Sequence, residues 1–256
     1  PKDIAFVYVL AAVHKDDISD HNLYYDTNHF GMINILNYCS EISVNNIIFF
    51  SSAAVYGNNF SNASEESKNL NPENHYGKSK VLAEKELNNW FFDKINRKVT
   101  IIRPSVVYGK GSKSNMNRMI DHISRGRFIM VGSGDNLKTV CYVENLVNFT
   151  IYIQSESIDS YSVYNYADFP HYKMKTLVNE ISKIVKKRII SIPYFLAFGI
   201  GLFFDLNAKI MRRKFNMSSD RVRKFCSDTS LSTEKIEALD YIPRYNLVES
   251  INKSIK

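Results

Sequence analysis

The sequence predicts an α/β protein with a doubly wound parallel sheet and a second, smaller domain. Short apolar segments rich in Ile, Val, Phe and Tyr alternate with longer segments of helical character as far as Gly109. Near-continuous apolar runs are typical of buried parallel strands, and their alternation with helices is typical of α/β folds. Beyond Gly109 the alternation loosens. We therefore assign residues 1–109 and 140–168 to the sheet domain, and residues 110–139 and 169–256 to the smaller domain interleaved with it.

The elements are expected in the following order. Strands are predicted at Ala5–Leu10, Asn46–Ser51, Val99–Arg103 and Ser162–Tyr166. Helices are predicted at Asn28–Ser40 and Asn74–Asn96, the second with Pro72 just before its start. Residues Asn58–Asn71 are expected to form a polar loop.

Composition is that of an ordinary globular chain, with 45% hydrophobic and 23% charged residues. Three widely spaced cysteines predict neither a disulfide framework nor a zinc site, so we expect a reducing, cytoplasmic environment. The longest apolar run, Ile192–Phe204, has 13 residues and is too short to span a bilayer.

A net charge of +7 raises the question of nucleic acid or an anionic membrane as partner. The basic residues cluster at Lys183–Arg188 and Lys209–Lys214. We favour a solvated helix face, and the second interpretation is peripheral contact with a membrane that carries lipid-linked sugars. No recognition-helix or aromatic stacking pattern accompanies the charge, so nucleic acid is not expected as a partner.

Tyr76 and Lys80 are four residues apart in a helical segment, so their side chains leave the same helix face. A phenol is a poor acid or base at neutral pH because its ordinary pKa is about 10. A neighbouring ammonium favours the phenolate and lowers that pKa. The pair is therefore a candidate for proton transfer.

Ser51 and Ser52 end the apolar strand upstream of this pair. Ligands of open α/β sheets bind beyond the carboxyl ends of the strands, so the two hydroxyls fall where chemistry is expected. A serine hydroxyl at that place can donate a hydrogen bond to a substrate oxygen while the tyrosine moves its proton. A plain strand end and a solvated helix are the structural alternatives. They are disfavoured because the serines, the Tyr76–Lys80 pair and Arg103-Pro104 after another apolar strand occur together in this order.

With these motifs in this order, the chain resembles the extended short-chain dehydrogenase/reductase family, in its nucleotide-sugar epimerase and dehydratase branch. The segments that carry the resemblance are Val7–Ala12, Tyr24–Asn28 with Gly31, Phe49–Gly57, the Tyr76–Lys80 helix, Ile101–Gly109 and Tyr142–Leu146. The resemblance implies a Rossmann-like sheet, a substrate-binding role for the smaller domain, NAD as cofactor with NADP as the alternative, a nucleotide-sugar substrate and a homodimer.

The family's opening strand and Gly-x-x-Gly-x-x-Gly turn have no counterpart among the ten glycines. We therefore expect that about three strand–helix units of the fold precede Pro1. The 256 residues alone are then expected to bind a dinucleotide weakly.

The resemblance also implies roles for single residues. Tyr76 is the expected catalytic acid/base, Lys80 binds the cofactor ribose and tunes Tyr76, and Ser52 is preferred to Ser51 as the catalytic serine. Asn28 is expected to be structural, bonding backbone near Lys80. Further cofactor-binding positions are expected at Ala11, Ala12, His14, Asn28, Ser51, Pro104, Ser105 and Val106.

On the substrate side, Lys138 falls where the family places an arginine that contacts the diphosphate, and Arg221 and Arg223 are further candidates. Val106 stands where galactose epimerases carry an asparagine. Sugar dehydratases place an acidic pair after the catalytic Ser or Thr, whereas this chain has Ala53 and Ala54, with Ala54 expected beside the substrate. Dehydration is therefore disfavoured. We predict a 4-epimerase, with a 4-keto-sugar reductase and a non-catalytic dinucleotide-binding protein as alternatives.

Overall fold

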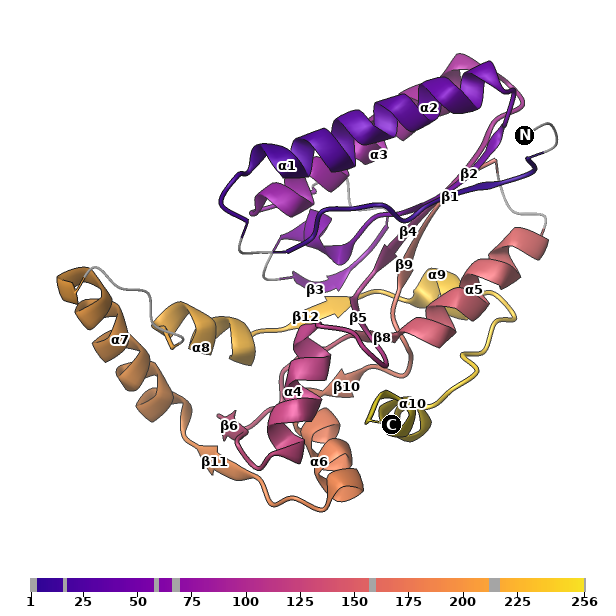
Figure 1. Ribbon diagram of the computed structural model, residues 1–256. Coiled ribbons are helices and arrows are strands. Elements are labelled where there is room, and N and C mark those ends of the chain that lie inside the picture. Colours follow the sequence, from indigo (N-terminus) through magenta and orange to yellow (C-terminus); the bar gives the residue numbers. More distant parts are fainter. Residues whose placement is uncertain are drawn as a thin grey trace.

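The fold is described by a computed structural model covering residues 4–15, 18–57, 60–65, 70–156, 160–211 and 217–255. Its centre is a four-stranded, all-parallel sheet in the order β1-β2-β4-β9 (Figure 1). These strands span Val7–Val9, Asn46–Phe50, Lys98–Pro104 and Tyr161–Tyr166. The predicted strands are confirmed, and the carboxyl ends of all four meet at one edge of the sheet.

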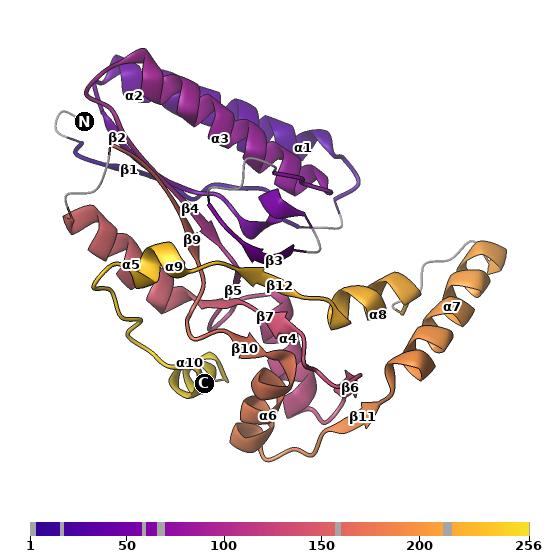
Figure 2. The same ribbon diagram turned by 180° about the vertical axis from the view of Figure 1, so that it is seen from behind.

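Helices cover both faces of this sheet. One face carries α3 (His75–Asp93) and a continuous helical segment. That segment consists of α1 (Asn22–Tyr25), the π-helix η1 (Asp26–Phe30) and α2 (Gly31–Glu41). The other face carries α5, Val143–Ser155, and α9, Glu234–Glu237 (Figure 2). Leu36 and Leu87 pack on Phe49 in the first layer, and Phe149 packs on Tyr164 in the second. The doubly wound α/β class predicted from sequence is thereby confirmed.

Several element boundaries differ from the prediction; the helix predicted to end at Asn96, for example, ends at Asp93. The first helical segment begins at Asn22, six residues before the predicted start, and contains the five-residue π-helix. The predicted polar loop contains a strand, β3 (Phe60–Ala63), which pairs with β12 (Thr229–Leu231) more than 160 residues later in the chain. A partner so distant leaves no local signal in the sequence.

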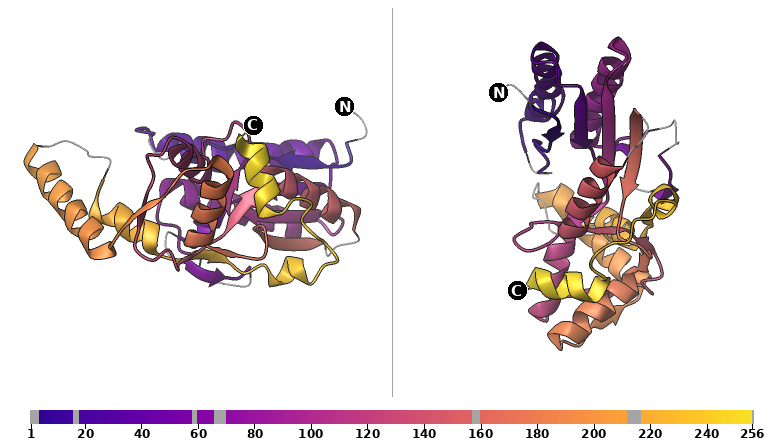
Figure 3. Two further views of the ribbon diagram at one scale, coloured as in Figure 1. Left: turned by 90° about the horizontal axis from the view of Figure 1, so that it is seen from below. Right: turned by 90° about the vertical axis from the view of Figure 1, so that its right-hand side faces the viewer.

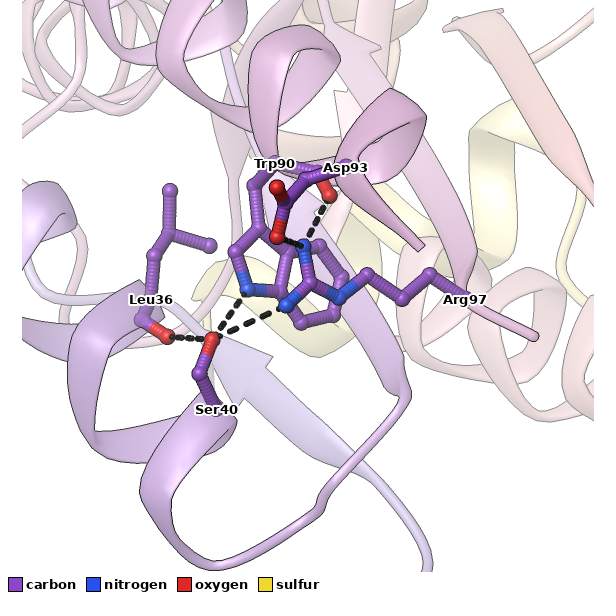
Figure 4. A network of polar contacts seen from close by, with 5 residues as sticks. All are labelled: Leu36, Ser40, Trp90, Asp93 and Arg97. Atoms are coloured by element: carbon purple, nitrogen blue, oxygen red, sulfur yellow. Dashed lines mark hydrogen bonds and ion pairs between the residues drawn. The ribbon is translucent and has the colours of Figure 1, made fainter. Parts of the chain in front are cut away.

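A polar network joins α2 to α3 at the end of the sheet where β2 and β4 begin (Figure 4). The Ser40 hydroxyl donates to the Leu36 carbonyl and accepts from Trp90 Nε1 at 2.9 Å and from an Arg97 nitrogen at 3.0 Å. The Arg97 guanidinium also lies 4.0 Å from the centre of the Trp90 ring and bonds Asp93 at 3.1 Å. Arg97 is therefore buried with its charge paired, as a buried cation requires.

The rest of the chain builds a second core beside the sheet. Tyr108, Ile123, Leu177 and Ile251 are among its buried residues. It comprises β5 (Val106–Tyr108), α4 (Asn115–Ser124), β8 (Val140–Tyr142), α6 (Met174–Val185) and α10 (Leu247–Ile255). A mixed sheet in the order β10-β7-β12-β3 connects the two parts, with β7 at Leu137–Lys138 and β10 at Tyr172–Lys173. The parts are interleaved along the chain, and the exact domain limits remain a prediction.

Helix α7, Tyr194–Met211, projects from the molecule next to α8, Ser219–Cys226 (Figures 1 and 3). It follows β11 (Ile190–Ile192), which pairs with β6 (Ile129–Val131). The helix is longer than the 13-residue apolar run on which the sequence argument rested. Among the described residues it is the one helix long and apolar enough to cross a membrane, with 18 residues of mean hydropathy 1.3, of which 11% are buried. Part of the predicted basic cluster at Lys209–Lys214 lies outside the described residues.

Candidate active site

The two serines at the end of β2 point in different directions. The Ser52 hydroxyl accepts the Ala54 amide at 3.1 Å and so caps the short 3-10 helix η2, Ala53–Tyr56. Its own proton remains available for a hydrogen bond outside the helix. The Ser51 hydroxyl is buried and donates to the Glu84 carboxylate. Ser52 is half-buried, whereas Ser51 is held inside the protein by its bond to Glu84.

Helix α3 brings Tyr76 and Lys80 to the same place. Asn74 caps its first turn by accepting the Gly77 amide at 2.7 Å. A side chain at Gly77 would come within 2.5 Å of the Ala54 carbonyl, so glycine lets α3 pack directly against η2. That approach places the first turn of α3, with Tyr76, beside the segment capped by Ser52.

Lys80 is 1% exposed and points along α3 toward the end of β2. Its Nζ donates to the Phe50 carbonyl at 2.9 Å and lies 5.9 Å from the centre of the Tyr76 ring. Burial lowers the pKa of Lys80 to about 8, and the charge of Glu84 opposes this effect. The ammonium has three N–H groups, so donors beyond the one used by Phe50 remain for a ligand.

Asn28 ties the π-helix to the segment after β1. Its side-chain oxygen accepts the Val13 amide at 2.8 Å, and its nitrogen donates to the Val13 carbonyl and the Ser79 hydroxyl, both at 2.9 Å. Ser79 directly precedes Lys80. π-Helical turns are frequent at functional sites, and here the turn aims a buried amide at two separate segments. Asn28 was predicted to bond backbone near Lys80; the backbone that it bonds belongs to Val13, and its contact next to Lys80 is with the Ser79 side chain.

A buried ion pair lies beneath these residues and was not among the predicted site residues. Arg103 donates to both oxygens of Glu84, at 3.0 and 2.6 Å, and also to the Tyr56 hydroxyl at 2.8 Å. Tyr56 in turn donates to Asn165 at 2.8 Å. The pair with Glu84 raises the pKa of Arg103 against the opposing effect of burial. A sequence signal exists: Arg103 interrupts an apolar strand, and Glu84 follows Lys80 by one helical turn.

The expected cofactor-binding residues lie along the carboxyl ends of β1 and β4. Ala11, Ala12 and His14 follow β1; Ala12 is half-buried and His14 is exposed. Pro104 ends β4, and the Ser105 amide bonds the Tyr166 carbonyl at 2.8 Å. The Ser105 hydroxyl is buried and has no hydrogen-bond partner within the described part of the chain. Val106 is 41% exposed at the start of β5.

The three candidate diphosphate ligands gather at α8. Lys138, on β7, donates through Nζ to the Lys224 carbonyl at 3.2 Å, and burial lowers its pKa to about 8. Arg221 and Arg223 are exposed on α8 itself. Lys138 therefore contacts α8, the helix that carries the two arginines.

A shallow hollow lined by Ser40, Asn45, Lys94 and Arg97 lies at the opposite end of the sheet, where β2 and β4 begin. It is remote from Tyr76 and belongs to the structural network between α2 and α3. Within the described ranges, no three His, Cys, Asp or Glu side chains gather as a metal site would require.

Comparison with known proteins agrees with this geometry. Residues 2–167 match the NAD dependent epimerase/dehydratase family. The chain is 40% identical over 253 residues to the N-acetyl-α-D-glucosaminyl-diphospho-ditrans,octacis-undecaprenol 4-epimerase of Escherichia coli O157:H7, covering 98% of this chain and 76% of that protein. It is 33% identical to the UDP-glucose 4-epimerase of Vibrio cholerae over 132 residues, which is 50% of this chain and 40% of that protein.

Among solved structures, the UDP-glucuronic acid 4-epimerase of Bacillus cereus in complex with NAD aligns over 98% of this chain and 73% of that one, with a TM-score of 0.74 and 18% identity. The structure of MoeE5 in complex with UDP-glucuronic acid and NAD aligns over 99% of this chain and 79% of that one, with a TM-score of 0.75 and 19% identity.

The protein is an α/β enzyme of the Rossmann-like class, and its cofactor is NAD. It belongs to the NAD-dependent epimerase/dehydratase family. The resemblance stated from the sequence motifs is thereby confirmed.

Proposed function

We propose that this protein is a 4-epimerase of an N-acetylhexosamine carried on polyprenyl diphosphate, with Tyr76 as its acid/base. The observation that carries the proposal is the 40% identity, over 98% of this chain, to a 4-epimerase whose name specifies such a substrate. The arrangement of Ser52, Tyr76 and Lys80 at one sheet edge supports it. A nucleotide sugar shares the sugar diphosphate and is the alternative carrier, favoured by the partial match to a UDP-glucose 4-epimerase.

In this proposal Tyr76 takes the proton of the sugar 4-hydroxyl and later returns it to the same oxygen. The Lys80 ammonium stabilises the phenolate that forms between the two steps. Ser52 donates its hydroxyl proton to the sugar oxygen, because its own oxygen already accepts the Ala54 amide. Ala53 and Ala54 carry no group that moves a proton, so elimination of water is not assisted. The keto sugar is held and reduced rather than dehydrated.

NAD would supply hydride transfer at the sugar C4, and epimerisation requires that the hydride be returned to the opposite face of the keto sugar. The residues present fit such a group: Lys80 has unused donors, and the Ser105 hydroxyl is buried without a described partner. Lys80 would hold the ribose, and Ala11, Ala12 and His14 would line the phosphate path. Pro104, Ser105 and Val106 would face the nicotinamide.

The remaining parts of the proposal concern the environment of the enzyme. The cysteines Cys39, Cys141 and Cys226 are free thiols, which fits a cytoplasmic protein. Exposed Phe30 and Phe92 on the helices over the sheet support a homodimer. Lys138, Arg221 and Arg223 would bind the diphosphate. A lipid carrier places the reaction at a membrane surface.

The test is a direct assay of carrier and configuration. Full-length enzyme is incubated with N-acetylglucosamine on polyprenyl diphosphate and, separately, with UDP-N-acetylglucosamine, and the released sugar is identified by chromatography. Conversion of the lipid-linked sugar to the galacto configuration is expected. Conversion of the nucleotide sugar alone would contradict the carrier, and conversion of neither would contradict the function.

A further inference from the structure

Helix α7 is attached to the protein by one narrow stripe. Ala197 and Gly201 are its buried residues, and Asp205 continues the stripe at the same four-residue spacing. A side chain at Gly201 would come within 2.6 Å of the Ser219 amide nitrogen, so the contact with the start of α8 is backbone to backbone. Asp205 accepts the Ser219 amide at 3.0 Å and its hydroxyl at 2.6 Å. These contacts fix the orientation of α7.

The opposite side of α7 is apolar and exposed. Its large hydrophobic residues there are between 44% and 71% exposed: Phe195, Leu196, Ile200, Leu202, Phe203, Leu206, Ile210 and Met211. At 3.6 residues per turn these side chains cover about half of the helix circumference, facing away from the Ala197–Asp205 stripe. Soluble proteins rarely leave so continuous an apolar face in water, so it indicates a partner.

The charge of the sequence segment that contains α7 indicates what kind of partner this apolar face binds. Residues 186–224 contain ten Lys or Arg and two Asp, a net charge of +8, whereas the whole chain carries +7. The positive charge of the sequence is therefore concentrated in the segment that contains α7. Lys186, Lys187 and Arg188 are exposed just before β11, and Lys209 is exposed on α7. An apolar helix face flanked by cations is typical of binding to the surface of an anionic bilayer.

The position of α7 relates this face to the substrate. Helix α8, against which α7 packs, carries Arg221 and Arg223, and its Lys224 carbonyl accepts from Lys138. The candidate diphosphate ligands thus lie beside the apolar helix. We propose that α7 docks on an anionic membrane by inserting its exposed face into the headgroup–acyl boundary, so that a polyprenyl-diphospho-sugar reaches Lys138 and α8 while its chain stays in the lipid. This assignment of α7 rests on the proposed function for the identity of the substrate.

The contacts of α7 define how it docks. At about 1.5 Å per residue its 18 residues could nearly cross a bilayer. However, Asp205 and the polar helix α8 are bound to its inner stripe and would have to enter the lipid with it. A helix that is bound to polar groups along one side and exposes an apolar face on the other lies parallel to the membrane surface.

The test compares two double variants of the full-length protein. Leu202→Glu with Leu206→Glu places charges on the exposed face, while Ile95→Glu with Ile242→Glu makes the same chemical change at apolar residues that are 100% and 84% exposed elsewhere. Co-sedimentation is measured with vesicles of phosphatidylethanolamine and phosphatidylglycerol, and with vesicles of phosphatidylcholine alone. Wild type and the control variant should bind the anionic vesicles, and the α7 variant should bind roughly tenfold or more weakly.

Turnover separates docking from chemistry. On a long polyprenyl substrate in vesicles the α7 variant should lose activity in parallel with binding, while on a short-chain, water-soluble prenyl diphosphate carrier its rate should match wild type. Equal vesicle binding by all three proteins would overturn the proposal. So would a change from dimer to monomer in the α7 variant, measured by light scattering, since the face would then bind a second copy. Wild type that binds vesicles but converts no substrate would instead contradict the proposed function.

Discussion

The ammonium of Lys80 lies 5.9 Å from the centre of the Tyr76 ring and is bonded to the Phe50 carbonyl at 2.9 Å. The second contact matters as much as the first, because it anchors a flexible lysine to the end of β2. The phenol, the ammonium and the strand end therefore form one rigid unit.

Replacing Tyr76 with Phe should lower the turnover rate by roughly a hundredfold or more, because the proposed proton carrier is lost. Only one hydroxyl is removed, so the thermal unfolding midpoint should stay close to that of wild type. Tyr38→Phe, an exposed tyrosine on α2, is the matched control. A Tyr76→Phe enzyme with more than about a tenth of wild-type activity would exclude Tyr76 as the acid/base.

The rate should depend on the charge of Lys80. Because burial lowers its pKa to about 8, Lys80 is charged below that pH and loses its charge as the pH rises through it. Support for the phenolate is lost in the same range, so kcat/KM should fall above about pH 8. The effect of Lys80 on stability has the opposite sign. A lysine in the unfolded chain has a pKa near 10.4, so between about pH 8 and 10.4 the unfolded state binds more protons than the folded state. The free energy of unfolding contributed by this group therefore rises with pH across that window.

In Lys80→Ala the fall near pH 8 should disappear and NAD affinity should drop roughly tenfold, since one charge-assisted hydrogen bond is lost. Calorimetry and a pH–rate profile measure the two effects. If both match wild type, Lys80 has no role beyond its contacts within the protein.

Substitution of Ser52 should affect mainly the reaction rate, and substitution of Ser51 mainly the stability. Ser52→Ala is expected to reduce the rate at least tenfold with little change in stability beyond a weakened η2 cap. Ser51→Ala removes a donor from the buried Glu84 carboxylate and should cost about 1–3 kcal/mol of unfolding free energy. Urea denaturation and steady-state kinetics on both variants provide the comparison. A reversed pattern, with Ser51→Ala inactive but stable, would make Ser51 the catalytic serine.

Glu84→Gln tests the ion pair beneath the site. The Arg103 and Glu84 side chains are 6% and 7% exposed, so removing the negative charge leaves a buried guanidinium uncompensated. The expected cost is about 3–5 kcal/mol of unfolding free energy. Asp121→Asn, which breaks the exposed pair with Arg125, should change stability by less than about 1 kcal/mol. Similar effects of the two substitutions in urea denaturation would show that the pair at Arg103 contributes little.

Much of the site could be predicted from the sequence because its signals are local. Four apolar runs located the strands of the sheet, and the four-residue spacing placed Tyr76 and Lys80 on one helix face. Ser52 was preferred over Ser51 as the catalytic serine and stays a prediction; the structure shows Ser52 capping η2 and Ser51 bonded to Glu84. Asn28 was expected to bond backbone near Lys80, whereas it bonds the Val13 backbone and the Ser79 hydroxyl.

What the sequence alone determined is the order of the elements and the identity of the chemical groups, because strands, helices and spacings are encoded by neighbouring residues. Tertiary structure decided the rest. Glu84 pairs with Arg103 across 19 residues, and β3 pairs with β12 across more than 160. No local pattern records which residue outside its own element a buried charge or a strand edge will meet. Exposure of the apolar side of α7 was decided in the same way. The sequence shows that Leu202 and Leu206 are apolar, but only packing against α8 through Gly201 determines that these side chains face outward.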